Sequence, residues 1–201
     1  MNSRLPVVCL ASVSPRRREL LAQIGVPHIA CGADIDETVR PREPPRDYVM
    51  RMARQKALTL RERGETLPVL AADTTVVLDG VIHGKPHNRD EGIAMLQRLS
   101  GRTHEVLTAV ALADSHDVAS RLSVSSVRFR ALTLEECDAY WETGEPCDKA
   151  GGYAVQGAAA VFIESLSGSY SGVMGLPLFE TAELLRAAGV PYWERNEEPQ
   201  G

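Results

Sequence analysis

The sequence predicts an α/β protein with an elongated, mixed and twisted sheet flanked by helices. Two β-α units come early in the chain, two long strand-like runs occupy its middle, and helical patterns alternate with them. The composition agrees, because 44% of the 201 residues are hydrophobic, 24% are charged and the net charge is only -5. These values are typical of a globular chain and exclude a disordered or collagen-like one. We expect a single domain over residues 1–201.

The first β-α unit has clear start and stop signals. An apolar run predicts a strand over 7–11. Ser14 then suits an N-cap, Pro15 suits the first helical position, and Gly25 marks the end of the helix. A second short strand is expected around 29–31. Together these elements predict a strand that feeds directly into the N-terminus of a helix.

The second unit begins after a Pro-rich turn at 41–45. Apolar residues recur with helical period over 47–63, which predicts a helix. The run 69–73 predicts a short strand that ends at a carboxylate, Asp73. Asp79-Gly80 is typical of a two-residue hairpin turn.

The second half of the chain predicts an antiparallel strand pair between helices. The pair consists of the runs 104–113 and 119–130. Thr133-Leu134-Glu135-Glu136 is a capping-box pattern, which opens a helix expected to reach about Glu142. The other elements expected here are a helix over 89–99, a strand over 160–165 and a closing helix over 177–188.

Composition disfavours several classes of partner. A mildly acidic chain lacks the basic face that polymeric nucleic acid requires, and no apolar run approaches the roughly 20 residues that span a membrane. The first residues have no signal-peptide pattern. The four cysteines have no C-x-x-C spacing, so we expect buried free thiols and a reducing, cytoplasmic location. The Gly168–Gly172 segment has tyrosine at its centre and is not a nucleophile elbow.

The turn from the first strand into the first helix suits a phosphate. Ser12 and the arginines at 16–18 surround a helix N-terminus, which offers free backbone N–H groups and a partial positive charge. A solvated basic first turn is the alternative. Basic residues there oppose the helix dipole, however, so a functional reason is favoured.

Four other polar residues are candidates for chemistry. Asp73 could bind a divalent cation or position a water, or it could cap a turn. Glu37 closes an acidic run that could ligate a cation or simply face solvent. Lys56 falls among the apolar positions of its helix, so it could point into a cleft, although a snorkelling lysine is the commoner explanation. Lys85 is held at a rigid corner between Gly84 and Pro86, where it could be another phosphate ligand.

Taken together, these residues resemble the Maf family of nucleoside triphosphate pyrophosphatases in three ordered blocks. The blocks are LASVSPRRRELL with DIDE, from Leu10 and Asp34; ADTTVVLDGVIHGKP with LSGRTH, from Ala72 and Leu99; and EPCDKAGGYAVQGAAAVFIESLSGSYSGVMGLPL, from Glu145. The resemblance implies two lobes around a deep cleft and, commonly, a homodimer.

The resemblance also implies an activity and its residues. Members of the family cleave a nucleoside triphosphate between the α- and β-phosphates, with a divalent metal such as Mg²⁺ or Mn²⁺. Asp73 matches the position of the general base. The other active-site positions match Ser12, Arg17, Glu37, Lys56 and Lys85, and Glu37 and Asp73 are the candidate metal ligands.

Three residues imply a pyrimidine substrate. Arg16, Thr74 and Gln156 match the branch that acts on dTTP and UTP. An amide both donates and accepts, so Gln156 could pair with the N3–H and a carbonyl of uracil or thymine. Glycines 151, 152 and 157 would let the backbone approach the base. Without the resemblance, a tight turn before a strand is the favoured interpretation of this loop.

Two other functions remain open at this point. A non-catalytic nucleotide-binding regulator, linked to cell division and septum formation, would use the same phosphate-binding residues. A phosphatase that releases orthophosphate would also suit an aspartate with basic neighbours. The identity of the products separates these possibilities.

Overall fold

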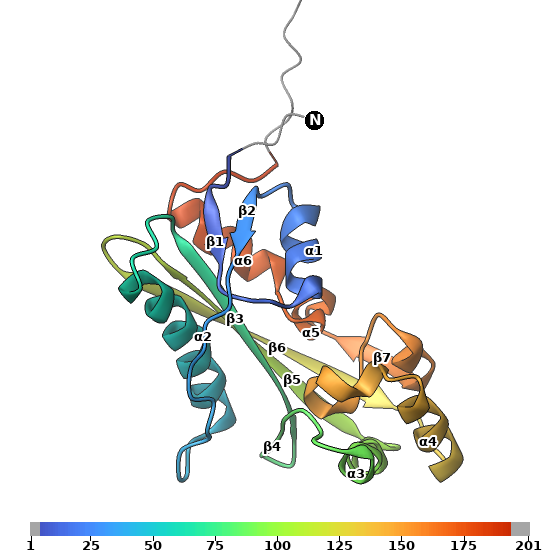
Figure 1. The fold of residues 1–201 in the computed structure, drawn as a ribbon. Coiled ribbons are helices and arrows are strands. Elements are labelled where there is room, and N and C mark those ends of the chain that lie inside the picture. Colours follow the sequence, from blue (N-terminus) through green and yellow to red (C-terminus); the bar gives the residue numbers. More distant parts are fainter. Residues whose placement is uncertain (1–4, 194–201) are drawn as a thin grey trace, which may run out of the picture.

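A seven-stranded mixed sheet organises the computed structural model, which describes residues 5–193 (Figure 1). The strands are β1 (Val8–Leu10), β2 (His28–Ala30), β3 (Val69–Leu78), β4 (Val81–His83), β5 (Thr103–Ala113), β6 (Val118–Phe129) and β7 (Ile163–Ser167). The α-helices are α1 (Pro15–Gln23), α2 (Pro45–Glu62), α3 (Arg89–Leu99), α4 (Leu134–Glu142), α5 (Tyr170–Met174) and α6 (Leu178–Ala187). Three 3₁₀ helices lie at Glu145–Asp148, Ala150–Gly152 and Ala158–Phe162.

The sheet has the order β2-β1-β3-β5-β6-β7, and β4 pairs with β3. β1 runs parallel to β2 and β3, and the other neighbours are antiparallel. The long strands β3, β5 and β6 cross the molecule obliquely and connect its two ends (Figure 1). The predicted α/β class and mixed sheet are confirmed.

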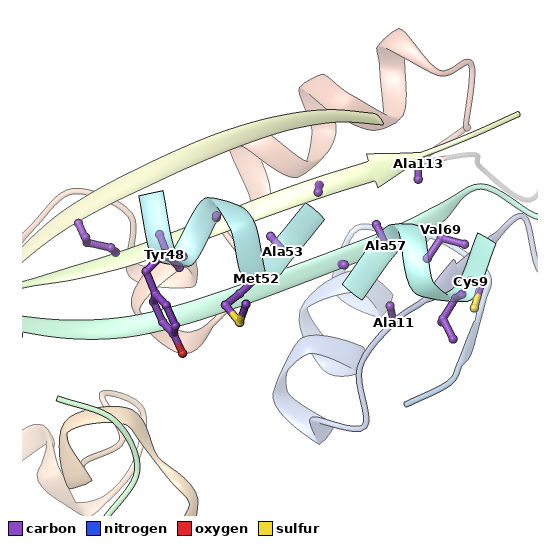
Figure 2. Packing of buried hydrophobic residues seen from close by; sticks show 14 of the residues in the cluster. Cys9, Ala11, Tyr48, Met52, Ala53, Ala57, Val69 and Ala113 are labelled. Carbon is purple, nitrogen blue, oxygen red and sulfur yellow. The ribbon is translucent and has the colours of Figure 1, made fainter. Parts of the chain in front are cut away.

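Helix α2 covers one face of the sheet. Its buried side of Met52, Ala53 and Ala57 packs on β3 and β5, whose inward residues on this face are small (Figure 2). Alanines on both surfaces let the helix approach the sheet closely, so this layer is dense and rigid. Lys56 lies on the same buried side of α2.

The opposite face of the sheet carries two separate groups of helices. Helices α1 and α6 pack near β1, with Leu21, Leu176 and Leu185 in their core. Helices α3 and α4 pack near the far ends of β5 and β6, around Leu96 and Phe129. Figure 1 shows these groups at opposite ends of the sheet, which gives the two predicted lobes.

A gap in the sheet separates the two lobes. β5 pairs along one edge of β3, so β1 and β4 share the other edge. β1 pairs with β3 only as far as Leu70, and β4 pairs from Val76 onward. Between them, residues 71–75 have no strand neighbour on that edge among the residues described. The polar residues of β3 lie in this gap.

Most predicted elements are present, and two local signals are confirmed in detail. The hairpin turn uses positive φ at both Asp79 (51°) and Gly80 (77°), as a type I′ turn requires. The capping box of α4 is complete, because Thr133 and Glu136 each bond the other's backbone. Within residues 5–193, none of the helices combines the length and the apolar character needed to cross a membrane.

Four details differ from the prediction. α2 begins at Pro45, because proline is favoured in the first helical turn. Residues 160–162, expected to open a strand, end a 3₁₀ helix, and β7 begins at Ile163. No sequence signal predicted α5, which is only five residues long. All four cysteines are free as expected, but Cys147 is exposed and Cys31 is only partly buried.

Candidate active site

The sheet gap is the floor of a deep cleft. The cleft has a volume of about 740 Å³ and draws its walls from both lobes and from α2. All nine residues singled out in the sequence line it: Ser12, Arg16, Arg17, Glu37, Lys56, Asp73, Thr74, Lys85 and Gln156. A second hollow of about 540 Å³, between the 35–41 loop and the outer side of α2, contains none of them.

The N-terminus of α1 forms one wall of the cleft. Ser14 is the N-cap, but its side chain accepts no capping bond. The Oγ of Ser12 accepts the backbone N–H of the N-cap residue, Ser14, at 3.2 Å. The prediction of Ser14 as the N-cap residue is confirmed, although its side chain makes no capping bond. Pro15 removes one of the N–H groups of the first turn, and Arg16 and Arg17 bring positive charge to it.

Arg17 is held by residues distant in sequence. Its Nε donates to the Gly175 carbonyl at 2.8 Å, and its terminal nitrogens donate to Thr74 Oγ1 at 3.2 Å and Ser12 Oγ at 3.4 Å. The turn after α5 therefore orients this guanidinium. That gives a role to the glycine-rich segment around 168–175, for which the sequence suggested none.

Asp73 lies inside a ten-residue strand and not at a strand end, so the predicted position is wrong. The chain continues as β3 because Thr75, Val76 and Val77 pair with β5. The strand that ends here is β1, whose pairing with β3 stops three residues before Asp73. Asp73 is consequently next to the sheet gap while it remains fixed by regular structure.

Lys56 joins the two candidate carboxylates. Its Nζ lies 2.7 Å from Asp73 Oδ1 and 2.7 Å from Glu37 Oε1. The relative exposure is 9% for Lys56 and 7% for Asp73, whereas the side chain of Glu37 is about half exposed. The lysine is therefore a buried ion-pair partner, and the snorkelling interpretation is wrong. A buried charge needs such compensation.

The two carboxylates differ in proton affinity. Burial raises the pKa of Asp73, although the charges of Lys56 and Arg17 oppose this rise. Burial also disfavours the charge of Glu37, but its hydrogen bond and attraction to Lys56 outweigh that effect and lower its pKa. Carboxyl groups whose pKa values are pushed apart are typical of sites that divide acid-base work.

The loop that carries Glu37 is held by hydrogen bonds from two residues of α2 that no sequence signal had marked as candidates. The hydroxyl of Tyr48 donates to the Glu37 carbonyl at 3.1 Å, and Arg51 Nη2 donates to the next carbonyl, that of Thr38, at 3.0 Å. Arg51 also makes a bidentate pair with Glu43, with both distances 2.6 Å. This pair lowers the pKa of Glu43 to about 2, so it persists at neutral pH.

The opposite wall comes from the β4 corner and the 148–156 segment. Lys85 lies in the cleft and its charge helps to lower the pKa of Glu37. Lys149 and Tyr153 line the same wall, although no sequence pattern assigned them to the site. Gln156 is exposed within the cleft, at a turn.

The glycines of this segment serve packing. A Cβ on Gly157 would overlap the carboxylate of Glu145, and one on Gly151 would press into Val76. These two glycines therefore have a packing role, and the expected approach of a base to the loop stays a prediction. Gly151 also has a φ of 70°, which favours glycine.

Thr74 points to the other face of β3 from Asp73. The Thr108 hydroxyl is 2.7 Å from the Gly172 carbonyl, which can only accept, so Thr108 donates its single proton there. Thr74, 3.0 Å from Thr108, then donates to Thr108 and accepts from Arg17. Its hydroxyl is thus engaged in holding Arg17.

A divalent metal fits the donors at the floor. Carboxylate oxygens are the ligands that Mg²⁺ and Mn²⁺ prefer, and Glu37 and Asp73 both reach a single atom, Lys56 Nζ. Among the described residues, no group of three or more His, Cys, Asp or Glu side chains could hold an ion. Two carboxylates completed by phosphate oxygens and water are the usual Mg²⁺ arrangement.

The fold and the site together define a class of protein. A cleft beside a strand-to-helix turn, with arginines, lysines and paired carboxylates on its walls, is suited to a small phosphorylated ligand. The comparisons with known proteins identify the family within this class. A family model described as Maf-like protein matches residues 7–188, and the chain belongs to the Maf family.

Relatives of known name cover nearly the whole chain. A dTTP/UTP pyrophosphatase of Alkalilimnicola ehrlichii is 55% identical over 193 residues, which cover 93% of this chain and 95% of that protein. A dTTP/UTP pyrophosphatase of Methylococcus capsulatus is 54% identical over 186 residues and 90% of each chain. The solved Ham1 protein of Staphylococcus aureus covers 61% of this chain and 71% of its own, at 12% identity and a TM-score of 0.41.

Proposed function

We propose that the protein is a nucleoside triphosphate pyrophosphatase that hydrolyses dTTP and UTP to the monophosphate and pyrophosphate. The observation that carries the proposal is the Asp73–Lys56–Glu37 group, with both distances 2.7 Å, at the floor of a cleft beside a helix N-terminus. The names of the relatives, which are 50–55% identical over most of the chain, support the substrate.

Asp73 is the proton acceptor in this mechanism. Burial raises its pKa and makes it a stronger base than an exposed aspartate, while Lys56 keeps it ionised. It takes a proton from a water that attacks the α-phosphorus. The bond between the α-phosphorus and the bridging oxygen breaks, and its electron pair leaves with pyrophosphate.

The cations of the cleft stabilise the charge that the leaving group acquires. Arg17 is fixed by hydrogen bonds to the Gly175 carbonyl, Thr74 and Ser12, and the remaining capacity of its guanidinium is available to a phosphate. Lys85 stands on the facing wall and Arg16 at the first turn of α1. Preorganised charges of this kind are usually the largest catalytic contribution.

Glu37 and Asp73 would hold a divalent cation, Mg²⁺ or Mn²⁺, in concert with the phosphate oxygens. When bound, the ion supplies neutralising charge to the triphosphate. Lys56 then balances the remaining negative charge of the two carboxylates. Glu37 keeps its charge at neutral pH because its pKa is lowered, which suits a ligand.

Gln156 reads the base. Its exposed amide can accept the N3–H of uracil or thymine and donate to an adjacent carbonyl. Cytosine has no N3–H, so an amide held in this orientation cannot make the same pair of bonds to it. This difference favours dTTP and UTP over CTP.

Product analysis tests the proposal. Purified protein is incubated with dTTP, UTP, CTP, 7-methyl-GTP and ATP, with Mg²⁺ or Mn²⁺, and the products are identified by chromatography. We expect pyrophosphate and monophosphate from dTTP and UTP. Tight binding without any product would favour a nucleotide-binding regulator of cell division, and release of orthophosphate would favour a phosphatase.

Two properties of the working protein belong to the same proposal. We expect a homodimer, as is common in the family, which sedimentation equilibrium would test. We also expect the protein to act in the cytoplasm, because its four cysteines are free thiols, as in a reducing compartment.

A further inference from the structure

Glu145 is a partly buried acidic group that the proposed mechanism does not use. Its Oε1 accepts the Tyr140 hydroxyl at 2.6 Å, and its Oε2 accepts the backbone N–H of Ala158 at 3.0 Å. The N–H of Ala159 lies 3.4 Å from Oε1. A carboxylate with donors on both oxygens is strongly held, since bonds to a charged acceptor are stronger than neutral ones.

These bonds enclose the loop that presents Gln156. Tyr140 also accepts the Ala154 N–H, at 3.2 Å, so α4 holds the chain two residues before Gln156. Glu145 holds the chain two residues after it, through Ala158. Gly157, between these points, leaves no room for a side chain against the carboxylate.

The charge state of Glu145 suits this role. Burial alone would raise its pKa, but the hydrogen bonds from Tyr140 and the two backbone amides outweigh burial and lower it. The group is therefore ionised at neutral pH. Neither Glu145 nor Tyr140 lines the cleft, so any effect they have on a ligand passes through the loop.

We propose that Glu145 and Tyr140 are positioning residues that set the pyrimidine preference by fixing the Gln156 loop from behind. The proposal rests on the proposed function, because it assigns a selective role to Gln156. A loop free to move by an ångström would still admit a triphosphate. It would no longer hold an amide in register with the edge of the base.

The variants that test this are Glu145→Gln and Tyr140→Phe, with Glu142→Gln as the matched control on the exposed end of α4. Glu145→Gln keeps the size of the side chain but turns one acceptor into a donor, which leaves one of its partners without an acceptor. Gly157→Ala attacks the same contact by adding a methyl group. Melting curves show whether each variant is folded.

Binding of the two products, measured separately, distinguishes a role in positioning the loop from a general loss of ligand binding. Calorimetry measures dTMP, which carries the base, and inorganic pyrophosphate, which does not. We expect Glu145→Gln to weaken dTMP roughly tenfold and Tyr140→Phe severalfold, with pyrophosphate unchanged. The double variant should resemble Glu145→Gln alone, because the pair acts as a unit. The preference for UTP over CTP should shrink in parallel, with KM affected more than kcat.

Hydrogen exchange gives a readout that is independent of substrate. Peptides covering 153–159 should lose protection in Glu145→Gln and keep it in Glu142→Gln. If the wild type hydrolyses dTTP with a base preference and Glu145→Gln keeps that preference, only this inference fails. If the wild type neither hydrolyses dTTP and UTP nor binds dTMP, the proposed function fails and the inference falls with it.

Discussion

The two walls of the cleft are built on different principles. On the floor and the α1 side, Lys56 and Asp73 lie on regular elements and form an ion pair, and Lys56 also pairs with Glu37 from a neighbouring loop. On the far wall, a loop presents an uncharged amide, Gln156, and its support lies outside the cleft. Packing of α2 on β3 holds the Lys56–Asp73 pair and three hydrogen bonds hold Arg17, while the base contact relies on hydrogen bonds to a loop from outside the cleft. Substitutions at the charged floor should therefore reduce turnover, whereas substitutions at the far wall should reduce the preference for the base.

The largest effect is expected from Asp73→Asn. The variant keeps the shape of the side chain and removes the proton acceptor, so kcat for dTTP should fall by at least about 10²-fold. Rapid-quench or steady-state assays of pyrophosphate release measure this, and dTMP binding should remain. Near-normal turnover would show that Asp73 is not the proton acceptor, and that the charged floor of the cleft does not carry the chemistry.

The pH dependence of activity tests whether Lys56 and Glu37 set the pKa of Asp73 at the floor of the cleft. Asp73 must be deprotonated to act, so activity should rise with pH through its raised pKa. Lys56→Met removes a cation that lowers this pKa, and the acid limb should move to higher pH with at least a severalfold loss of kcat at neutral pH. Glu37→Gln removes an anion that raises it, and the limb should move to lower pH. Movement in the same direction in both variants would contradict the assignment.

Gln156→Ala should act on selection and leave the chemistry largely intact. Losing one or two hydrogen bonds to the base predicts a roughly tenfold drop in kcat/KM for dTTP and UTP, with a much smaller change for CTP. Competition assays with mixed nucleotides measure the ratio directly. An equal loss for all three substrates would show that the far wall does not read the base.

The smallest effect is expected from Thr108→Val. The change is nearly isosteric but removes the acceptor for Thr74, which in turn loosens Arg17. We expect KM to rise about two- to fivefold, the range for one buried hydrogen bond, and Thr108→Ser to restore it. A KM unchanged by Thr108→Val would indicate that the Gly175 carbonyl alone orients Arg17.

Local signals in the sequence predicted the elements that depend on neighbours in the chain. The capping box at Thr133 and the Asp79-Gly80 turn act within a few residues, so their pattern is enough to place them. The turn around Ser12 could also be nominated, because hydroxyl and basic residues surround the predicted start of the first helix. The strand end at Asp73 was predicted wrongly, since pairing with β5 carries β3 past a polar stretch that looks like a turn.

The sequence by itself determined the class of fold, the ends of most elements and which residues were available for chemistry, because these follow from short-range periodicity, capping and turn geometry. Only the tertiary structure decided which of them meet. Arg17 and the Gly175 carbonyl are 158 positions apart, and Lys56 reaches Asp73 only because α2 packs across β3. The proton affinities of Asp73 and Glu37, and the support that Glu145 gives to Gln156, likewise depend on burial and on partners distant in sequence or in another element. Local sequence patterns do not determine contacts between residues that are distant in the chain, because those contacts depend on how the elements pack.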